Sequence, residues 1–320
     1  SREVKMHRIN DFIITDETEI ASLLAPFDST LTILDFSLMK DSMSNSGYIV
    51  TTNSGKYFLK IYSKTTDKIE TAALSYLKNK INVPALFFYD GSKQRFPFAY
   101  AIMEFLDGVT FINHVRSNLK YPPEMAYEIG RICATIHERS YAHNALLDGK
   151  LNLLQELPRT RDKILHLLNG KPSEYLKPET IDSLCRFIKE NPDLFDSIEA
   201  KSVLCHGDLG YANIMISDGK VSFIDFEFTY SGSIYHDIGH FFRRKDDDVE
   251  ALINRHIYDA FAQGYNSVSA SPLPSNWLTL AHLCDISAML CLLTYDNVPT
   301  EWVEDIENDI LCAIDEGRRL

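Results

Sequence analysis

Residues 205–225 hold the densest group of side chains in the chain that are able to take part in catalysis. Asp208 lies on a polar loop, Asn213 follows five residues later, and Asp225 comes after two short apolar runs. Phosphoryl transfer from ATP depends on positioning and charge. It needs one carboxylate to accept or orient a proton and hard oxygen ligands for Mg²⁺. The segment therefore supplies the side chains that such a reaction requires.

A predicted hairpin brings these residues together. The dipeptide Asp218-Gly219 is a strong two-residue turn signal between the runs 213–216 and 221–224. Such a turn sets Asn213 opposite Ile224 and leaves Asp225 beside Asn213 at the open end. Strict strand alternation would put Asn213 and Asp225 on opposite faces, so one of them must leave the ladder.

A lysine suited to phosphate binding lies upstream. Lys60 shares a predicted strand face with Phe58 and Tyr62, where a charge is unexpected unless it has a partner or a cleft to reach. Glu70, on the next predicted helix, is placed to pair with Lys60 and to hold it against the phosphates of a nucleotide. The alternative is that Glu70 forms a capping box with Asp67, and the two roles are compatible.

A small polar loop precedes the predicted strand that pairs with the strand of Lys60. Residues 42–47 read Ser-Met-Ser-Asn-Ser-Gly and lead into a β-rich run. Backbone N–H groups in such a loop are able to cover phosphates. On its own the loop is a weak signal.

The elements that position these residues fall into two parts. A hairpin over 48–52 and 57–62, an amphipathic helix over 69–77 and an apolar run over 98–106 make the first hundred residues β-rich with one helix. After Gly108 helices dominate; Pro122-Pro123 opens one, and the only expected β interruption is residues 203–225. The pattern predicts an α+β protein with a small β-rich lobe hinged to a larger, mostly helical lobe.

Several of these motifs together resemble the aminoglycoside phosphotransferase family, which includes choline-kinase-like and other small-molecule kinases. The resemblance covers roughly residues 40 to 245. Its motifs are the loop 44–48, Lys60, the segment 103–108, His206-Gly207-Asp208 with Asn213, Ile224-Asp225-Phe226-Glu227 and Tyr235-His236-Asp237-Ile238. The motifs of the second half are specific, and those of the first half are weaker.

The resemblance implies a protein-kinase-like bilobal fold and a role for each matching residue. The implied parts are a nucleotide-binding lobe at 1–103, a hinge at 104–108 and a catalytic and acceptor-binding lobe at 109–320. The implied site residues are Asp208 as catalytic base, Asn213 and Asp225 as Mg²⁺ ligands, Ser44, Asn45 and Ser46 as the nucleotide loop, Lys60 on the ATP phosphates with Glu70 bracing it, the backbone of Glu104 and Leu106 at the adenine, Glu227 near the acceptor or the metal, and Asp237 bracing the catalytic loop.

Two departures from eukaryotic protein kinases bear on the substrate. Gly207 stands where those enzymes have the arginine of His-Arg-Asp, which acts in activation-loop control. No recognisable activation segment follows Asp225. Both favour constitutive phosphorylation of a small molecule, with ATP or GTP as donor, over regulated protein phosphorylation.

Two other interpretations compete. His236-Asp237-Ile238-Gly239-His240 resembles the metal site of HD-type phosphohydrolases, but that reading leaves Lys60, Glu70 and the β-rich lobe without a role. A catalytically inactive nucleotide-binding module is the other. Inactive kinases usually lack the base or a metal ligand, and here Asp208, Asn213 and Asp225 are all present.

The acceptor is less well defined. Residues 277–293 predict a buried helix with His282 and Asp285 on one face, both candidate acceptor-binding residues. A buried carboxylate needs a partner, which for Asp285 is either a protein cation or amide, or the ammonium group of a substrate. An aminoglycoside or another amine-bearing antibiotic or metabolite is the first expectation. A neutral sugar, a macrolide or an amino-alcohol stays open, as does a role in antibiotic resistance or in metabolism.

Composition and charge restrict the ligands and the cellular location that we expect. The chain has 320 residues and a net charge of −13, which argues against general nucleic-acid binding and suits a cationic small molecule. Residues 277–293 are too few, and too polar at His282 and Asp285, for a membrane span. Residues 1–5 carry no apolar signal core, and the six cysteines are scattered without a CxxC pair. These features predict a cytoplasmic protein, and no obligate protein partner is evident.

Overall fold

The computed structural model describes residues 11–40, 44–244 and 247–320. Residues 1–5, on which the expectation about a signal core rests, and Ser42 and Met43 of the polar loop lie outside these ranges. The chain divides into two compact units. Unit 1 comprises Ser1–His114, Asp148–Asn152 and Ala212–Phe228, and unit 2 comprises Val115–Leu147, Leu153–Tyr211 and Thr229–Leu320. The functional lobes at 1–103, 104–108 and 109–320 stay a prediction.

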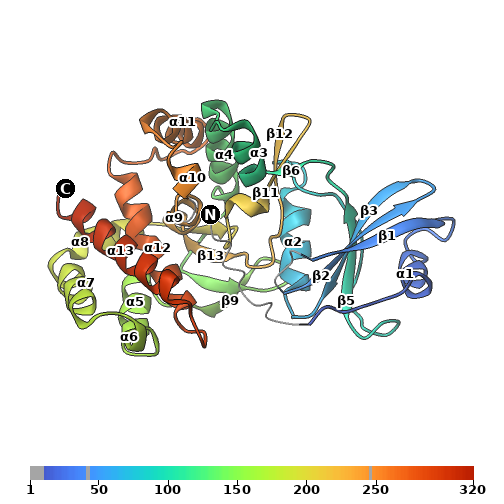
Figure 1. Ribbon diagram of the computed structural model, residues 1–320, viewed down its shortest axis with the longest axis horizontal. Coiled ribbons are helices and arrows are strands. Elements are labelled where there is room, and N and C mark those ends of the chain that lie inside the picture. The colour runs from blue at the N-terminus through green and yellow to red at the C-terminus, as the bar shows by residue number, and fades with distance from the viewer. Residues whose placement is uncertain (1–10, 41–43, 245–246) are drawn as a thin grey trace. The chain divides into compact units, whose positions relative to one another are not determined.

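Unit 1 is built on an antiparallel sheet of five strands in the order β1-β2-β3-β5-β4, with a second sheet of three strands in the order β12-β11-β6 (Figure 1). Its elements are α1 (Glu17–Leu24), β1 (Ile33–Met39), β2 (Ser46–Thr52), β3 (Gly55–Tyr62), α2 (Asp67–Leu77), β4 (Leu86–Asp90), β5 (Ala99–Glu104), β6 (Val109–Thr110), β11 (Ile214–Ser217) and β12 (Lys220–Phe223).

The two faces of the five-stranded sheet have different roles. Alternate residues of β2, β3 and β5 join Ile20, Leu23 and Leu24 of α1 in one hydrophobic core; the strand residues are Tyr48, Val50, Leu59, Ile61, Tyr100 and Ile102. Because side chains alternate along a strand, Lys60 points to the opposite face. That face carries α2, and Lys60 is buried there.

Both predicted hairpins and the predicted helix of unit 1 are confirmed. Strands β2 and β3 pair antiparallel with Gly47 opposite Lys60, and β11 and β12 pair with Ile216 opposite Val221. The turn of the second hairpin uses Asp218 and Gly219 at φ 48° and 73°, the left-handed region that a two-residue type I′ turn needs. The helix predicted over 69–77 is α2.

Unit 2 is mostly helical. Its elements are α4 (Pro123–Ile136), β7 (Ser140–Tyr141), β8 (Ala145–Leu147), β9 (Leu153–Glu156), α5 (Thr160–Leu168), α6 (Pro172–Tyr175), α7 (Pro178–Glu190), α8 (Pro192–Ile198), β10 (Ser202–Cys205), β13 (Tyr230–Ser233), α9 (Ile234–Phe241), α10 (Asp247–Glu250), α11 (Arg255–Asn266), α12 (Trp277–Leu292) and α13 (Thr300–Gly317). Two elements, α3 (Phe111–Asn118) and the 3₁₀ helix η1 (Tyr211–Asn213), cross the boundary between the units along the chain.

Prolines begin four of these helices. Pro123, Pro172, Pro178 and Pro192 are the first residues of α4, α6, α7 and α8. Proline suits that position because its fixed φ matches the helix and its missing N–H would have no partner there. The helix expected to open at Pro122-Pro123 is therefore confirmed.

The expectation of a single β interruption after Gly108 is wrong. Strands β7, β8, β9 and β13 join β10 in a sheet of the order β7-β10-β13-β8-β9. Each of these four strands has two to four residues, which is too short for a period-2 pattern to stand out in the sequence.

Helices α9 and α12 approach each other closely in unit 2. A Cβ atom on Gly239 would lie 2.3 Å from the carbonyl oxygen of Ala281, so only glycine fits at this contact. Helix α12 is buried, as predicted, and it packs also against α13 (Figure 1). Among the described residues, no helix is both long and apolar enough to cross a membrane.

Candidate active site

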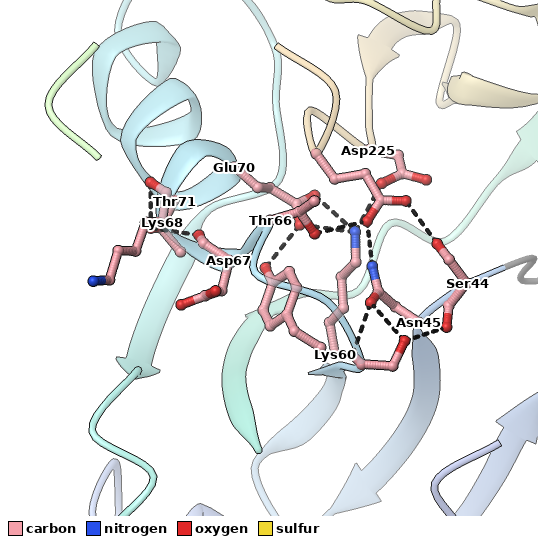
Figure 2. Close-up of polar contacts among 12 residues, drawn as sticks. Ser44, Asn45, Lys60, Thr66, Asp67, Lys68, Glu70, Thr71 and Asp225 are labelled. Carbon is pink, nitrogen blue, oxygen red and sulfur yellow. Dashed lines mark hydrogen bonds and ion pairs between the residues drawn. The ribbon is translucent and has the colours of Figure 1, made fainter. Parts of the chain in front are cut away.

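Lys60 lies at the centre of a buried polar cluster in unit 1. Its Nζ atom is 2.8 Å and 3.0 Å from the two carboxylate oxygens of Glu70 and 2.7 Å from Oδ1 of Asp225 (Figure 2). Burial alone would lower the pKa of Lys60, but the carboxylates of Asp225 and Glu70 outweigh it and raise that pKa. Lys60 is therefore a fixed cation, held from two sides.

Glu70 uses its carboxylate for Lys60 and not for a capping box. The second partner of that carboxylate is the hydroxyl of Tyr62, which donates at 2.7 Å. Burial raises the pKa of Glu70, while Lys60 acts in the opposite direction. The N-cap of α2 is Thr66, and Asp67 accepts a hydrogen bond from Tyr89. The pairing predicted between Glu70 and Lys60 is thus present.

The polar loop before β2 is anchored through its side chains. Ser44 Oγ donates to Glu227 at 2.9 Å, and the side-chain amide of Asn45 donates to the other carboxylate oxygen. Asn45 also accepts from the backbone N–H of Ser63 at 3.1 Å, and Ser46 Oγ accepts from the N–H of Ile13 at 2.9 Å.

Glu227 is buried, and its contacts in unit 1 are with this loop and with α2. Thr66 Oγ1, at the start of α2, donates to Glu227 at 3.0 Å. The residue is 5% exposed. We define the Lys60 cluster as Ser44, Asn45, Lys60, Thr66, Glu70, Asp225 and Glu227. The role predicted for Glu227 near the acceptor or the metal stays a prediction.

Asn213 and Asp225 flank the β11–β12 hairpin, as the turn signal predicts. The carbonyl oxygen of Asn213 accepts from the N–H of Ile224 at 3.0 Å, which continues the ladder by one step. Asp225 then leaves the ladder with φ 65°, and Asn213 lies in η1. Carboxylate and amide oxygens are hard ligands of the type that Mg²⁺ takes, and the side chain of Asp225 is 35% exposed. The donor set at this end of the hairpin therefore fits Mg²⁺.

The predicted hinge follows β5 directly. The N–H of Glu104 donates to Ala85 O at 2.8 Å, and its carboxylate accepts from the N–H of Ala85 at 3.1 Å. Leu106 is half-buried in the segment between β5 and β6. These contacts fix the end of β5 but do not test adenine binding.

In unit 2, Asp237 holds the loop that carries Asp208. Its carboxylate accepts from the backbone N–H groups of His206 at 2.7 Å and of Gly207 at 2.9 Å. His137 Nε2 lies 3.1 Å from the same carboxylate. Burial would raise the pKa of Asp237, but the hydrogen bond and charge of His137 lower it to about 2. A buried anion thus fixes two successive peptide groups directly before Asp208.

Asp208 contacts a histidine of α9. His240 Nε2 is 3.3 Å from Oδ1 of Asp208, whose side chain is 39% exposed. Asp208 belongs to unit 2, whereas Asn213 and Asp225 belong to unit 1.

The two candidate acceptor residues on α12 have protein partners. Arg243 forms a two-pronged ion pair with Asp285, with N···O distances of 2.6 Å and 2.5 Å. Burial would lower the pKa of Arg243, but Asp285, and further away Asp208, raise it. His282 Nδ1 lies 2.7 Å from Glu316.

Arg243, His282 and Asp285 line a pocket of unit 2. We call it the α12–α13 pocket; its lining residues are Arg243, Arg244, His282, Asp285, Met289 and Asp309. His282 Nε2 is buried and has no hydrogen-bond partner within the described part of the chain. Burial raises the pKa of Asp309 to about 6, against the attraction of Arg244. The pocket thus holds polar groups that the protein itself leaves incompletely paired.

Comparison with known proteins agrees with this geometry. The family model described as the phosphotransferase enzyme family matches residues 35–272, most of the chain. The chain belongs to the phosphotransferase enzyme family. The predicted recognition and the predicted enzyme class, a small-molecule kinase that acts on an alcohol group, are therefore confirmed.

Solved structures of other phosphotransferases share the fold. The streptomycin–ATP ternary complex of APH(2″)-IIa is 17% identical, with a TM-score of 0.63 over 94% of this chain and 97% of that one. Choline kinase from Cryptosporidium parvum is 14% identical, with a TM-score of 0.60 over 95% and 96%. Macrolide 2′-phosphotransferase from Brachybacterium faecium is 14% identical, with a TM-score of 0.65 over 92% and 97%. At these identities the likeness concerns the fold, and it confirms the α+β kinase-like class. No curated protein sequence matches the chain.

Membership of the phosphotransferase family sets the two rival interpretations aside. Asp237, the residue that suggested an HD-type metal site, is buried and holds the loop before Asp208. His137, Cys205 and Asp237 are close enough for a metal site, but His137 already contacts Tyr265 and Asp237. The group is explained by hydrogen bonding.

Sequence reasoning missed several residues around the site. Thr66, Arg243 and Asp309 stand outside the recognised motifs, and His137 lies at the end of α4, far from the loop it supports along the chain. His240 was named only as part of the motif that resembles an HD-type metal site. The sequence did offer one signal for His137, a polar side chain on the buried face of a predicted helix. That signal indicates that His137 needs a hydrogen-bond partner but does not identify Asp237 as the partner.

Proposed function

We propose that this phosphotransferase moves the γ-phosphoryl group of ATP onto a hydroxyl group of a small molecule that carries an amine. Asp208 acts as the base, and Asn213 and Asp225 hold Mg²⁺. The observation that carries the proposal is Lys60, a buried cation in contact with both Glu70 and Asp225. A cation held by two carboxylates next to a candidate metal ligand is suited to nucleotide phosphates. GTP is the alternative donor.

The metal and nucleotide roles follow from donor chemistry. Asn213 and Asp225 supply oxygen ligands at one end of a hairpin, and Mg²⁺ bound there would neutralise charge on the phosphate oxygens. Lys60 contacts the phosphates from the sheet, and the loop of Ser44, Asn45 and Ser46 covers them through its backbone. The backbone of Glu104 and Leu106 meets the adenine.

The reaction itself needs little covalent help. The acceptor oxygen forms a bond to the γ-phosphorus while the bond from that phosphorus to the β,γ-bridging oxygen breaks, releasing ADP. Asp208 accepts the hydroxyl proton on a carboxylate oxygen. This role is supported by the loop that Asp237 fixes and by the partial exposure of Asp208.

We assign one polar group of the acceptor, its amine, to the α12–α13 pocket, because the pocket's volume of about 10 Å³ holds a group the size of a water molecule. Arg243 pairs with Asp285, and Arg244 pairs with Glu316 at 2.6 Å and with Asp309 at 3.9 Å, so Asp309 is the most weakly paired of the three carboxylates. His282 contacts Glu316 through Nδ1, and its Nε2 has no hydrogen-bond partner among the described residues. An imidazole nitrogen without a partner and a weakly paired carboxylate suit a ligand that carries amino and hydroxyl groups.

The small molecules named with similar proteins agree with a cationic acceptor. Streptomycin and choline, named with two of the solved structures, carry cationic groups as well as hydroxyls. The net charge of −13 would favour the approach of such a cation. In this assignment Asp285 braces Arg243, and His282 and Asp309 meet the substrate.

A screen of acceptors tests the proposal. Purified protein is mixed with Mg²⁺, ATP or GTP, and either aminoglycosides, amino-alcohols, macrolides or neutral sugars, and nucleoside diphosphate release is followed. Turnover should require an amine-bearing acceptor and should fall when that amine is acetylated. Equal turnover of the acetylated form would contradict the amine assignment.

Two variants test the site within the same assay. Asp309→Asn should raise KM for the amine-bearing acceptor, whereas Asp315→Asn, an exposed position of the same helix, should not. Asp225→Ala should abolish the gain in ADP affinity that Mg²⁺ gives in calorimetry. Equal Mg²⁺-dependent binding by wild type and Asp225→Ala would remove Asp225 from the metal site.

A further inference from the structure

The carboxylate of Glu227 joins three segments of unit 1 that are far apart along the chain. Its hydrogen-bond donors are Ser44 and Asn45 of the polar loop and Thr66 at the N-cap of α2. The first two lie 183 and 182 residues away, and the third 161. Figure 2 shows Ser44 and Asn45 next to each other, beside Lys60.

Such a carboxylate is costly to bury unless it is compensated. Glu227 is 5% exposed, and a buried charge requires hydrogen bonds or a counter-charge. Its three donors are neutral, and the charge of Lys60 attracts it as well. The start of α2 adds a favourable helix dipole, because a negative group is stabilised near a helix N-terminus.

The donors on the loop come from residues that are themselves fixed on the other side. Asn45 accepts from the N–H of Ser63, directly after β3, while Ser63 Oγ donates to the carbonyl oxygen of Ser44 at 2.5 Å. The loop is thus tied between β3 and Glu227. Loss of Glu227 would leave the tie to Ser63 but release the loop from α2 and from the segment that carries Asp225.

We propose that Glu227 is a positioning residue that latches the nucleotide loop onto α2. The latch sets the loop in the conformation that receives a nucleotide, so Glu227 acts on nucleotide affinity through Ser44 and Asn45. It does so without being an acceptor-binding residue. This inference rests on the proposed nucleotide site, but the loop's mobility is measurable without any nucleotide.

The first measurement is amide hydrogen exchange of the nucleotide-free protein. Glu227→Gln keeps the shape but replaces a charged acceptor with an amide. Thr66→Val removes one of the donors to Glu227 and leaves the loop residues and the carboxylate itself unchanged. Both should speed exchange over residues 44–50, by about tenfold for Glu227→Gln if one charge-assisted hydrogen bond is lost. Exchange over β5 should stay unchanged, and Glu17→Gln on the exposed face of α1 is the matched control.

The second measurement is ADP affinity by calorimetry, with Mg²⁺ and with a chelator. Loss of the latch should weaken ADP binding by the same factor in both conditions, in Glu227→Gln and, to a smaller extent, in Thr66→Val. If Glu227→Gln fails to fold, Thr66→Val with Ser44→Ala opens the latch from the donor side and should show the same exchange and affinity changes.

One pattern would overturn the latch. Wild-type exchange over residues 44–50 in Glu227→Gln, together with ADP affinity lost only when Mg²⁺ is present, would make Glu227 part of the metal site instead. Failure of all variants and wild type to bind ADP would reject the proposed nucleotide site, while faster exchange in the variants would still support the latch.

Discussion

In unit 1 the buried charges of the Lys60 cluster satisfy one another, whereas in unit 2 the α12–α13 pocket leaves polar atoms incompletely paired. Lys60 contacts both Glu70 and Asp225, and Glu227 has three donors. In the pocket, His282 Nε2 lacks a hydrogen-bond partner among the described residues, and burial raises the pKa of Asp309.

The contrast matches two different tasks. A nucleotide is the same in every phosphotransferase, so its site gains from being organised before binding. An acceptor must be chosen among similar molecules, and buried polar groups that only the right ligand can satisfy give that choice. We therefore propose that the charged groups of unit 1 organise the nucleotide site before binding and that those of the pocket select the acceptor.

The largest expected effect separates catalysis from nucleotide binding. Asp208→Asn should lower kcat by about 10²–10⁴-fold, the usual contribution of a general base. ADP affinity should stay at the wild-type value, because the Lys60 cluster is intact. Steady-state turnover on the acceptor found by the screen, together with calorimetry, checks both. A kcat within about threefold of wild type would show that Asp208 is not the base.

The next effect probes whether Asp285 braces the pocket. Asp285→Asn leaves the buried guanidinium of Arg243 without its counter-charge, so the free energy of unfolding should fall by about 3–5 kcal/mol. Urea denaturation measures this change. KM for the acceptor should change little in the folded fraction. An unchanged stability with a raised KM would mean instead that Asp285 meets the substrate.

Acid should weaken the catalytic loop through Asp237. Its pKa is lowered to about 2 in the folded protein from 3.8, so its stabilisation is present above about pH 4 and is lost as the pH falls toward 2. The shift corresponds to about 2 kcal/mol. The stability difference between wild type and Asp237→Asn, measured in urea, should shrink over that range. A difference independent of pH would contradict the assignment.

The smallest effect has the opposite sign. The pKa of Asp309 is raised to about 6, so its ionised form destabilises the fold, and the cost appears as the pH rises from about 4 through 6. Arg244 and His282 attract the charge, while Glu250 and Asp285 repel it. Asp309→Asn should therefore stabilise the ligand-free protein by about 1 kcal/mol near neutral pH, after allowance for solvent screening.

Thermal unfolding near pH 4 and pH 7.5 tests this last prediction. The variant should melt higher than wild type only at the higher pH, and Asp315→Asn should show no such gain. Destabilisation at both values would place Asp309 among the structural residues and outside the pocket's unpaired groups.

Local signals in the sequence predicted much of unit 1. The turn at Asp218-Gly219 and the alternation around Lys60 depend on neighbours in the chain. Both predicted hairpins formed, and the second formed in the predicted register. The pairing of Lys60 with Glu70 was also within reach, because an inward-facing charge calls for a partner on the next element. The short strands of unit 2 could not be predicted, because two to four residues are too few to show a clear alternation of apolar and polar side chains.

By itself, the sequence determined which side chains the chain offers for phosphoryl transfer: a lysine on an inward strand face, a candidate base and two candidate oxygen ligands for a metal. It also showed that Asp285 and Lys60 must have partners. Tertiary structure alone decided which partners they have. Arg243 lies 42 residues from Asp285, and Ser44 lies 183 residues from Glu227. Contacts at such separations depend on how each unit folds within itself, and a burial pattern along one strand or helix reports only that a partner is needed.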